Sequence, residues 1–402
     1  MSDSSRRPEA VSVWRAPGMP ALLATTALGF AGFAALMPVA PLWARHIGAD
    51  EAGAGLVNAV LMVATVAFQT GVPWALRTLG WRTTFVAGLI LLGAPSAFFA
   101  LATTLPAVLA LSAVRGAGFA VLTVCGASAV AHLVAPSHRG RAIGAYGLAI
   151  ALPQVVLVPG APLIAEHVGF GAVFAIGAVP IVAVPFAAIL GARVDRAAPD
   201  DDEPDAGRVG LRTVLALAVP AVVLLAVTTP GGALITFAAQ LPYPPLVATI
   251  GLLALTGIAA FARWLAGGLA DRYGPYRFMW PLLLLSAAAL CAVAWAAGGG
   301  APFALIAGMF LVGIAYGALQ NLTLVASFAA VPNRMRDTAS TVWNIGFDAG
   351  TGLGSLAVGF IAAGTSFGTA FLVTAALSLA VAAFIGLRYA RAIGRARRAP
   401  AN

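Results

Sequence analysis

Residues 267–274 read Gly-Gly-Leu-Ala-Asp-Arg-Tyr-Gly, a charged and glycine-rich stretch that lies between two long apolar runs. The chain around it has 402 residues, of which 61% are hydrophobic and only 9% are charged. A soluble protein has no need of such long apolar runs on both sides of one short polar turn. Membrane proteins do, because helices that cross the bilayer must reverse direction at its surface. The stretch therefore predicts a turn between two membrane-spanning helices.

Apolar runs of this kind recur along the whole chain, and its mean hydropathy is +0.95. A helix of about 20 residues crosses the hydrocarbon core of a bilayer. A soluble all-helical protein would instead carry a charged face on each helix, whereas these runs are apolar nearly all round. We therefore predict an all-α integral membrane protein with twelve transmembrane helices, over residues 19–44, 53–76, 83–102, 105–134, 140–165, 170–192, 211–238, 245–270, 277–297, 302–330, 338–364 and 368–390.

The basic residues, all of them arginine, gather at every second connection between these spans. Four of the alternate connections, at residues 103–106, 240–244, 298–302 and 365–368, carry no charge, whereas the first holds Arg45, His46, Asp50 and Glu51. This alternation is the positive-inside pattern, and it predicts a multi-pass protein of the cell inner membrane with both termini cytoplasmic. The net charge of +9 then reflects orientation and anionic lipid headgroups rather than nucleic-acid binding.

Two pairs of equivalent turns divide the chain into similar halves. Gly80 and Gly274 are 274 − 80 = 194 residues apart, and Pro136 and Pro332 are 332 − 136 = 196 apart. Nearly equal offsets indicate a duplicated six-helix unit. We predict two pseudo-symmetric six-helix bundles that rock about a site at the membrane midplane. Their bounds are a cytoplasmic tail at 1–18, bundles at 19–192 and 211–390, an acidic linker at 193–210 and a tail at 391–402.

The sequence offers no pattern for catalysis or for a cofactor. Cys125 and Cys291 both lie in apolar spans, which argues against a disulfide or a metal site. Histidines and acidic residues are scattered, and no nucleophile–base pair or phosphate loop is present. We therefore expect no enzyme activity, no cofactor and no metal.

The turn at residues 267–274 matches the G-x-L-A-D-R-x-G signature of the major facilitator superfamily, in its second-half position. Arg115 with the adjacent Gly116–Gly118 resembles an arginine motif that is common among proton-coupled members. Residues 159–162, Pro-Gly-Ala-Pro, resemble a degenerate antiporter signature of drug–proton exporters. The whole chain thus resembles the twelve-helix drug:proton antiporters. It departs from the family pattern at Arg77, where an aspartate is usual.

One acidic residue stands deep inside an apolar span. Thr341, Asn344, Asp348, Thr351 and Ser355 recur at spacings of three and four, which places them on one helix face. A carboxylate at mid-membrane is costly and commonly carries protons or faces a water-filled cavity. Asp348 is therefore interpreted as the coupling-proton carrier or a ligand for a cationic group, the alternative being a structural acid bonded to a neighbouring helix.

Arg115 is the second costly residue of the predicted coupling site. It either attracts an anionic group and tunes a carboxylate or extends to the membrane interface. Polar residues inside other spans are candidates for contact with substrate, and some of them are expected only to join helices. The substrate candidates are Thr341, Asn344, Asn58, Gln154, Tyr316, Gln320 and Asn321.

Charged turns at the cytoplasmic side form a predicted gate. Asp271 is expected to pair with Arg139 or Arg141, and Arg77 with Asp337, which would close this side in the outward-open state. The full set of gate residues is Gly267, Asp271, Arg272, Gly274, Arg77, Arg82, Arg139, Arg141 and Asp337.

The predicted function is secondary active transport, as proton-coupled efflux of a small organic compound by alternating access. One alternative is a proton-coupled importer of a sugar, organic acid or amino-acid-like solute. Another is a membrane sensor that transports nothing. The expected partners are a small-molecule substrate, protons and the lipid bilayer, without nucleic acid, and the expected state is a monomer.

Overall fold

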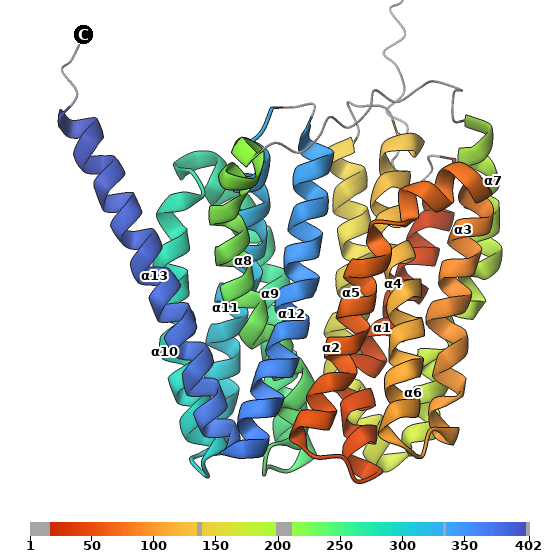
Figure 1. Ribbon diagram of the computed structural model, residues 1–402, viewed down its shortest axis with the longest axis horizontal. Coiled ribbons are helices and arrows are strands. Elements are labelled where there is room, and N and C mark those ends of the chain that lie inside the picture. The colour runs from red at the N-terminus through yellow and green to blue at the C-terminus, as the bar shows by residue number, and fades with distance from the viewer. Residues whose placement is uncertain (1–16, 135–138, 198–210, 333–334, 399–402) are drawn as a thin grey trace, which may run out of the picture.

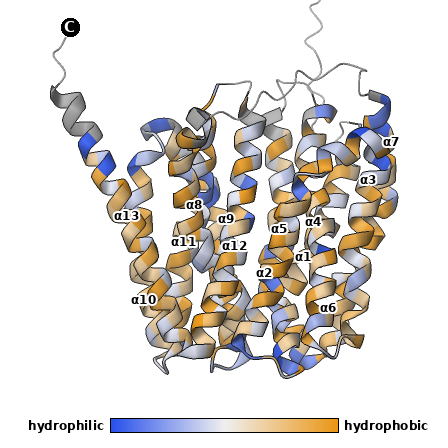
Figure 2. Cartoon of the chain, in the orientation of Figure 1, coloured by the Kyte–Doolittle hydropathy of each residue, from blue (hydrophilic) through white to orange (hydrophobic). Residues whose placement is uncertain are grey.

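The computed structural model describes residues 17–134, 139–197, 211–332 and 335–398, and these residues form a bundle of helices that run side by side (Figure 1). In this part of the chain, twelve helical segments are long and apolar enough to cross a membrane, as the sequence predicts. Hydrophobic residues follow the helices along their length, and hydrophilic ones gather toward their ends (Figure 2).

The elements follow one another in a simple order. They are α1 (Met19–His46), α2 (Glu51–Gln69), α3 (Val72–Ala97), η2 (Phe99–Leu101), α4 (Leu105–Leu133), α5 (Arg139–His167), α6 (Phe170–Gly177), η4 (Val179–Ala183), α7 (Val184–Ala197), α8 (Leu211–Phe237), η5 (Ala238–Gln240), α9 (Pro245–Tyr273), α10 (Tyr276–Ala297), α11 (Pro302–Ala329), α12 (Arg336–Gly364) and α13 (Phe367–Arg398).

Two spans are less continuous than predicted. The second apolar run ends as α2 at Gln69, and helix resumes only at Val72, because Pro73 lacks an N–H and its ring clashes with the carbonyl four residues earlier. The predicted span 170–192 is split into α6, η4 and α7 around Pro180 for the same reason. Average hydropathy does not detect such breaks, because proline interrupts hydrogen bonding without making a segment polar.

The N-terminal half, α1–α7, lies beside the C-terminal half, α8–α13 (Figure 1). The two predicted turns have nearly the same unusual backbone: Gly80 has φ 77° and ψ 167°, and Gly274 has φ 76° and ψ 148°. Side chains other than hydrogen rarely fit this region. Gly80 divides α3 into two helices, and Gly274 separates α9 from α10.

Packing within the halves repeats as well. A Cβ atom on Gly116 of α4 would meet the carbonyl oxygen of Leu61 in α2. A Cβ atom on Gly313 of α11 would meet the carbonyl oxygen of Leu255 in α9. The glycines are 313 − 116 = 197 residues apart and the leucines 255 − 61 = 194 apart. Both halves therefore bring the same two helices into backbone contact, as the duplication predicts.

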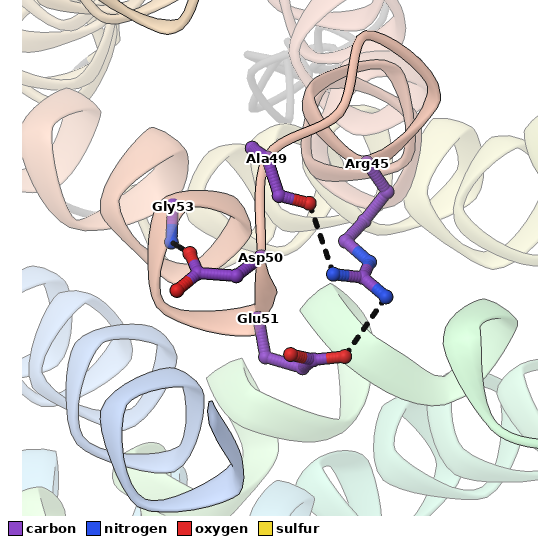
Figure 3. A network of polar contacts seen from close by, with 5 residues as sticks. All are labelled: Arg45, Ala49, Asp50, Glu51 and Gly53. Atoms are coloured by element: carbon purple, nitrogen blue, oxygen red, sulfur yellow. Dashed lines mark hydrogen bonds and ion pairs between the residues drawn. The ribbon is translucent and has the colours of Figure 1, made fainter. Parts of the chain in front are cut away.

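We call the side with the Gly80 and Gly274 turns the arginine-rich face. On the opposite face, the α1–α2 loop holds the charges that break the alternation (Figure 3). Arg45 Nη2 lies 2.8 Å from Glu51 Oε1, and Arg45 Nη1 donates to the Ala49 carbonyl at 2.9 Å. Asp50 accepts a 2.8 Å hydrogen bond from the Gly53 N–H and so caps α2. These charges are satisfied locally, and the loop gains no net positive charge from Arg45.

Helix α2 meets α12 and α8 of the other half between the opposite face and mid-depth. Gly55 of α2 lies against the Ser355 carbonyl of α12, and a Cβ atom on it would also lie 3.3 Å from the Gly359 Cα. Asn58 Nδ2 of α2 donates to Thr236 Oγ1 of α8 at 2.9 Å and to the Met37 carbonyl at 2.8 Å. We call this contact of α2 with α12 and α8 the interbundle contact.

Helix α12 also has a glycine face toward its own half. A Cβ atom on Gly350 would meet the Thr228 hydroxyl of α8, and one on Gly354 would meet the Thr229 carbonyl. Small residues at such spacing let membrane helices approach backbone to backbone. Helix α12 therefore packs closely on α8 of its own half and on α2 of the other half.

Candidate functional site

The carboxylate of Asp348 joins the two halves at mid-depth. It lies 348 − 336 = 12 residues after the start of α12, or about 18 Å along a helix that crosses a bilayer core about 30 Å thick. Its side chain is buried, and Oδ2 accepts a 2.7 Å hydrogen bond from Gln69 Nε2 at the end of α2. The acid predicted to be functional therefore contacts the other bundle rather than a helix of its own.

The side-chain amide of Gln69 can hydrogen-bond to Asp348 whether that carboxyl group is ionised or protonated. Its Nε2 donates to the carboxylate, while its buried Oε1 has no partner in the described part of the chain. A carboxamide has a donor and an acceptor side, and rotation by 180° exchanges them. Gln69 can thus donate to an ionised Asp348 and accept from a protonated one.

A second charged residue, Arg263 of α9, is absent from the sequence-based predictions. It lies 273 − 263 = 10 residues before the end of α9, or about 15 Å from the arginine-rich face. Its Nη1 donates to Gln320 Oε1 of α11 at 3.1 Å, and its guanidinium carbon lies 5.9 Å from the Trp343 ring centre on α12. The sequence signal for this residue is an arginine inside an apolar span, away from the arginines at the span ends.

Aromatic rings connect Arg263 to Asp348. The rings of Trp343 and Phe347 lie 5.7 Å apart at 25°, and Tyr316 of α11 lies 6.2 Å from Phe347. Arg263 and Asp348 are the charged neighbours of Tyr316. Three helices of the C-terminal half therefore place a cation, an acid and three rings around one region.

Arg115 of α4 lies in the N-terminal half and is buried, with 1% of its surface exposed. Its Nη2 donates to the Gly32 carbonyl of α1 at 3.2 Å, and the guanidinium lies 5.8 Å from the Phe99 ring centre. Its buried Nε has no partner among the described residues. The structure therefore does not extend Arg115 to the interface, the alternative considered from the sequence.

The structure brings some predicted substrate residues together and separates others. Tyr316 and Gln320 surround Arg263, and Asn321 lies near Gly267, its Nδ2 3.6 Å from where a Cβ atom would be. Asn344 donates to the Ser340 carbonyl of its own helix, and Thr341 is exposed. Away from this group, Asn58 takes part in the interbundle contact and Gln154 of α5 donates to the Ile150 carbonyl.

The structure describes the side chains of only some of the predicted gate residues. The side chains of Asp271, Arg139, Arg141 and Asp337 lie outside the described residues, so both predicted ion pairs remain predictions. Arg77 and Arg82 are exposed, and the Arg272 guanidinium lies 5.2 Å from the Tyr273 ring centre.

A contact that the sequence did not predict holds the Gly80 turn. Asp195 of α7 accepts the backbone N–H of Trp81 at 2.8 Å and that of Arg82 at 3.2 Å. These amides begin the second helix of α3 and would otherwise lack an acceptor. A carboxylate at the start of a helix is also favoured by the helix dipole. Asp195 therefore ties α7 to the turn at the arginine-rich face.

Comparison with known proteins agrees with this architecture. The family model described as Major Facilitator Superfamily matches residues 22–344 and 221–401. The curated proteins named MFS-type transporter ppzB, from Metarhizium rileyi and Metarhizium majus, are each 32% identical to this chain over 116 residues, 29% of its length. The chain spans about a quarter of the length of these relatives, 24% and 25%.

Solved transporter structures share the fold. A bacterial homolog of the human lysosomal transporter Spinster, inward-facing and unoccupied, has a TM-score of 0.72 at 17% identity, over 92% of this chain and 96% of that one. The nucleoside transporter NupG gives 0.71 at 13% identity, over 93% and 99%. The POT family transporter PepTSo gives 0.73 at 14% identity, over 94% and 98%. The chain therefore belongs to the Major Facilitator Superfamily, and it is a multi-pass membrane transporter rather than an enzyme.

Proposed function

We propose that this chain is a proton-coupled secondary transporter of a small organic compound that works by alternating access. The observation that supports the proposal best is the buried hydrogen bond between Asp348 of the C-terminal half and Gln69 of the N-terminal half. An ionisable residue inside a membrane bundle commonly lies on a proton pathway. Here it also lies at a contact between the two halves that must move.

The coupling follows from the state of this hydrogen bond. Ionised Asp348 holds a charge-assisted hydrogen bond to Gln69, which is stronger than a bond between neutral groups. Protonation weakens that bond and removes a buried charge, so it changes the energy of separating α2 from α12. Proton binding then shifts the balance between conformations by its differential effect on them.

The direction of coupling depends on the charge of the substrate. A cation competes with the proton for Asp348, which gives exchange and hence the efflux predicted from the sequence. An anion held by Arg263 binds best when Asp348 is protonated, which gives co-transport. Co-transport is the second candidate, and the presence of Arg263 near Tyr316 favours it.

Orientation, location and assembly complete the proposal. Both termini are proposed to be cytoplasmic in the cell membrane, because arginines dominate the face with the Gly80 and Gly274 turns. The bundle of α1–α13 holds both halves in one chain, and we propose that it works as a monomer.

The test uses purified protein in liposomes with a trapped pH-sensitive dye and a clamped membrane potential. Organic ions that carry no proton through the lipid, 1-naphthalenesulfonate and N-methylquinolinium, are loaded inside the vesicles. Release that acidifies the lumen reports exchange, and release that makes it alkaline reports co-transport.

Asp348→Asn is expected to lower proton movement at least about tenfold, since an amide cannot carry the proton. Asp50→Asn is the matched control, because asparagine also caps a helix well. The proposal is contradicted if Asp348→Asn moves protons as fast as the wild type. It is also contradicted if the wild type moves no protons with either of the two organic ions.

A further inference from the structure

Arg263 has unused capacity to bind an anion. A guanidinium has five N–H donors, and in the described part of the chain one hydrogen bond, to the neutral Gln320, is formed. No carboxylate among the described residues forms an ion pair with Arg263, whose partners are an amide and the Trp343 ring. Part of Arg263 is exposed although its contact with Gln320 is partly buried, so a ligand can contact the guanidinium.

The surroundings of Arg263 fit a flat apolar body. Trp343 Nε1 donates to Thr323 Oγ1 at 3.0 Å, which fixes the orientation of the indole ring. Phe347 continues this surface, with its ring 25° from that of Trp343. Tyr316 is half-buried, and its hydroxyl has no hydrogen-bond partner in the part of the chain that the structure describes. The site therefore offers aromatic faces together with hydrogen-bond donors.

The charged side chains near mid-depth favour a negatively charged ligand. Among the described residues, the charged side chains near mid-depth are Arg115, Arg263 and Asp348. Two cations and one acid leave an excess of positive charge even with the acid ionised. Binding an anion beside Arg263 neutralises part of this positive charge, whereas binding a cation adds to it.

The internal repeat marks Arg263 as a specialised position. Its equivalent in the N-terminal half is Gln69, since 263 − 69 = 194, the offset between the Gly80 and Gly274 turns. The position that holds Gln69, the amide bonded to Asp348, in the N-terminal half is thus occupied by the permanently charged Arg263 in the C-terminal half. A purely structural hydrogen bond to Gln320 would not require this charge.

We propose that Arg263 binds the anionic group of an organic acid whose flat apolar body lies against Trp343, Phe347 and Tyr316. This inference rests on the proposed transport function and deepens it by naming the substrate class. Asp348 directly follows Phe347 on α12, so an ionised Asp348 repels an anion held against these rings, and its protonation increases the affinity for the anion. Proton and anion then bind together and cross together.

The test measures binding by calorimetry in detergent, without transport. The probes are 1-naphthalenesulfonate, its neutral sulfonamide and N-methylquinolinium, which share a two-ring body and differ in charge. The wild type is expected to bind the sulfonate at least about tenfold more tightly than the sulfonamide, the usual contribution of a charged hydrogen bond. Arg263→Gln is expected to lose that preference and Arg263→Lys to keep part of it. Gel filtration and thermal unfolding verify that each variant is folded.

Two further results test the link to the proton. Asp348→Asn, a mimic of the protonated acid, is expected to bind the sulfonate at least as tightly as the wild type and without pH dependence. Equal sulfonate binding by Arg263→Gln and the wild type, no sulfonate binding at all, or preference for the quinolinium overturns the inference.

Binding and proton movement separate this inference from the proposed function. Arg263-dependent sulfonate binding in a protein that moves no protons supports the inference and refutes proton coupling. Asp348-dependent proton movement driven only by the quinolinium supports proton coupling and refutes the anion site.

Discussion

Gly55→Ala tests whether the interbundle contact belongs to one conformation of an alternating cycle. The added methyl would lie 3.2 Å from the Ser355 carbonyl carbon and 3.3 Å from the Gly359 Cα, and closer still to the Ser355 oxygen. These are backbone atoms, which cannot rotate away, so α2 and α12 must move apart. Overpacking of this kind costs about 1–3 kcal/mol.

This cost applies only to conformations in which α2 and α12 touch on the opposite face. Alternating access separates them there in the other conformation, so the equilibrium shifts toward it by about 5- to 150-fold. Gly317→Ala is the matched control, because its methyl would meet the Ala259 carbonyl within the C-terminal half. That clash is present in both conformations and is expected to lower thermal stability without changing their ratio.

Pulsed electron resonance between two spin labels measures the shift. His167 at the end of α5 and Leu246 at the start of α9 line the same surface pocket on the opposite face, one from each half. Labels at these positions, with Cys125 and Cys291 replaced by alanine, are expected to show longer distances in Gly55→Ala. An unchanged distribution, together with a loss of stability equal to that of Gly317→Ala, would refute the idea that the contact opens.

Three further substitutions test contacts that hold the turns and the halves. Asn58→Ala removes the hydrogen bond to Thr236, so it is expected to lengthen the same spin-label distance and to lower the free energy of unfolding by about 1–3 kcal/mol. An unchanged distance contradicts a role of Asn58 in the interbundle contact. Asp195→Ala is expected to lower the free energy of unfolding by about 1 kcal/mol, and Asp195→Asn by less, because asparagine can still accept the Trp81 N–H. Chemical denaturation measures both values, and an equal loss of unfolding free energy in the two variants argues against this capping role. Gly80→Ala is expected to cost about 1–3 kcal/mol through backbone strain, and wild-type thermal stability would contradict this.

The number and order of the spans follow from the sequence because the length of each apolar run must match the thickness of the bilayer core. The predicted 245–270 corresponds to α9, and the turn at Gly274 was located by its polar residues. Helix breaks near Pro73 and Pro180 were missed because hydropathy averages over single prolines. Local patterns therefore predicted the frame of the molecule but not its interruptions.

The site was only partly predictable, because its contacts connect distant segments. Helical spacing placed Asp348 on a polar face, yet no local pattern selects Gln69, 279 residues away, as its neighbour. Asp195 and Trp81 likewise meet only through packing of α7 on α3. Arg263 is, like Arg115, a charge within an apolar span, so its place in the membrane could be predicted from the sequence, but its partners Gln320 and Trp343 could not.

Helix α12 meets α2 through Gly55, Gly352 and Gly359, where backbone lies against backbone or, at Gly352, against the Met62 side chain. Where backbone lies against backbone, separating the two helices requires no side chain to be withdrawn from a pocket. The energy lost on separation is then spread over many weak backbone contacts and a few hydrogen bonds. We expect such a contact to lower the barrier to sliding and tilting of α12 on α2.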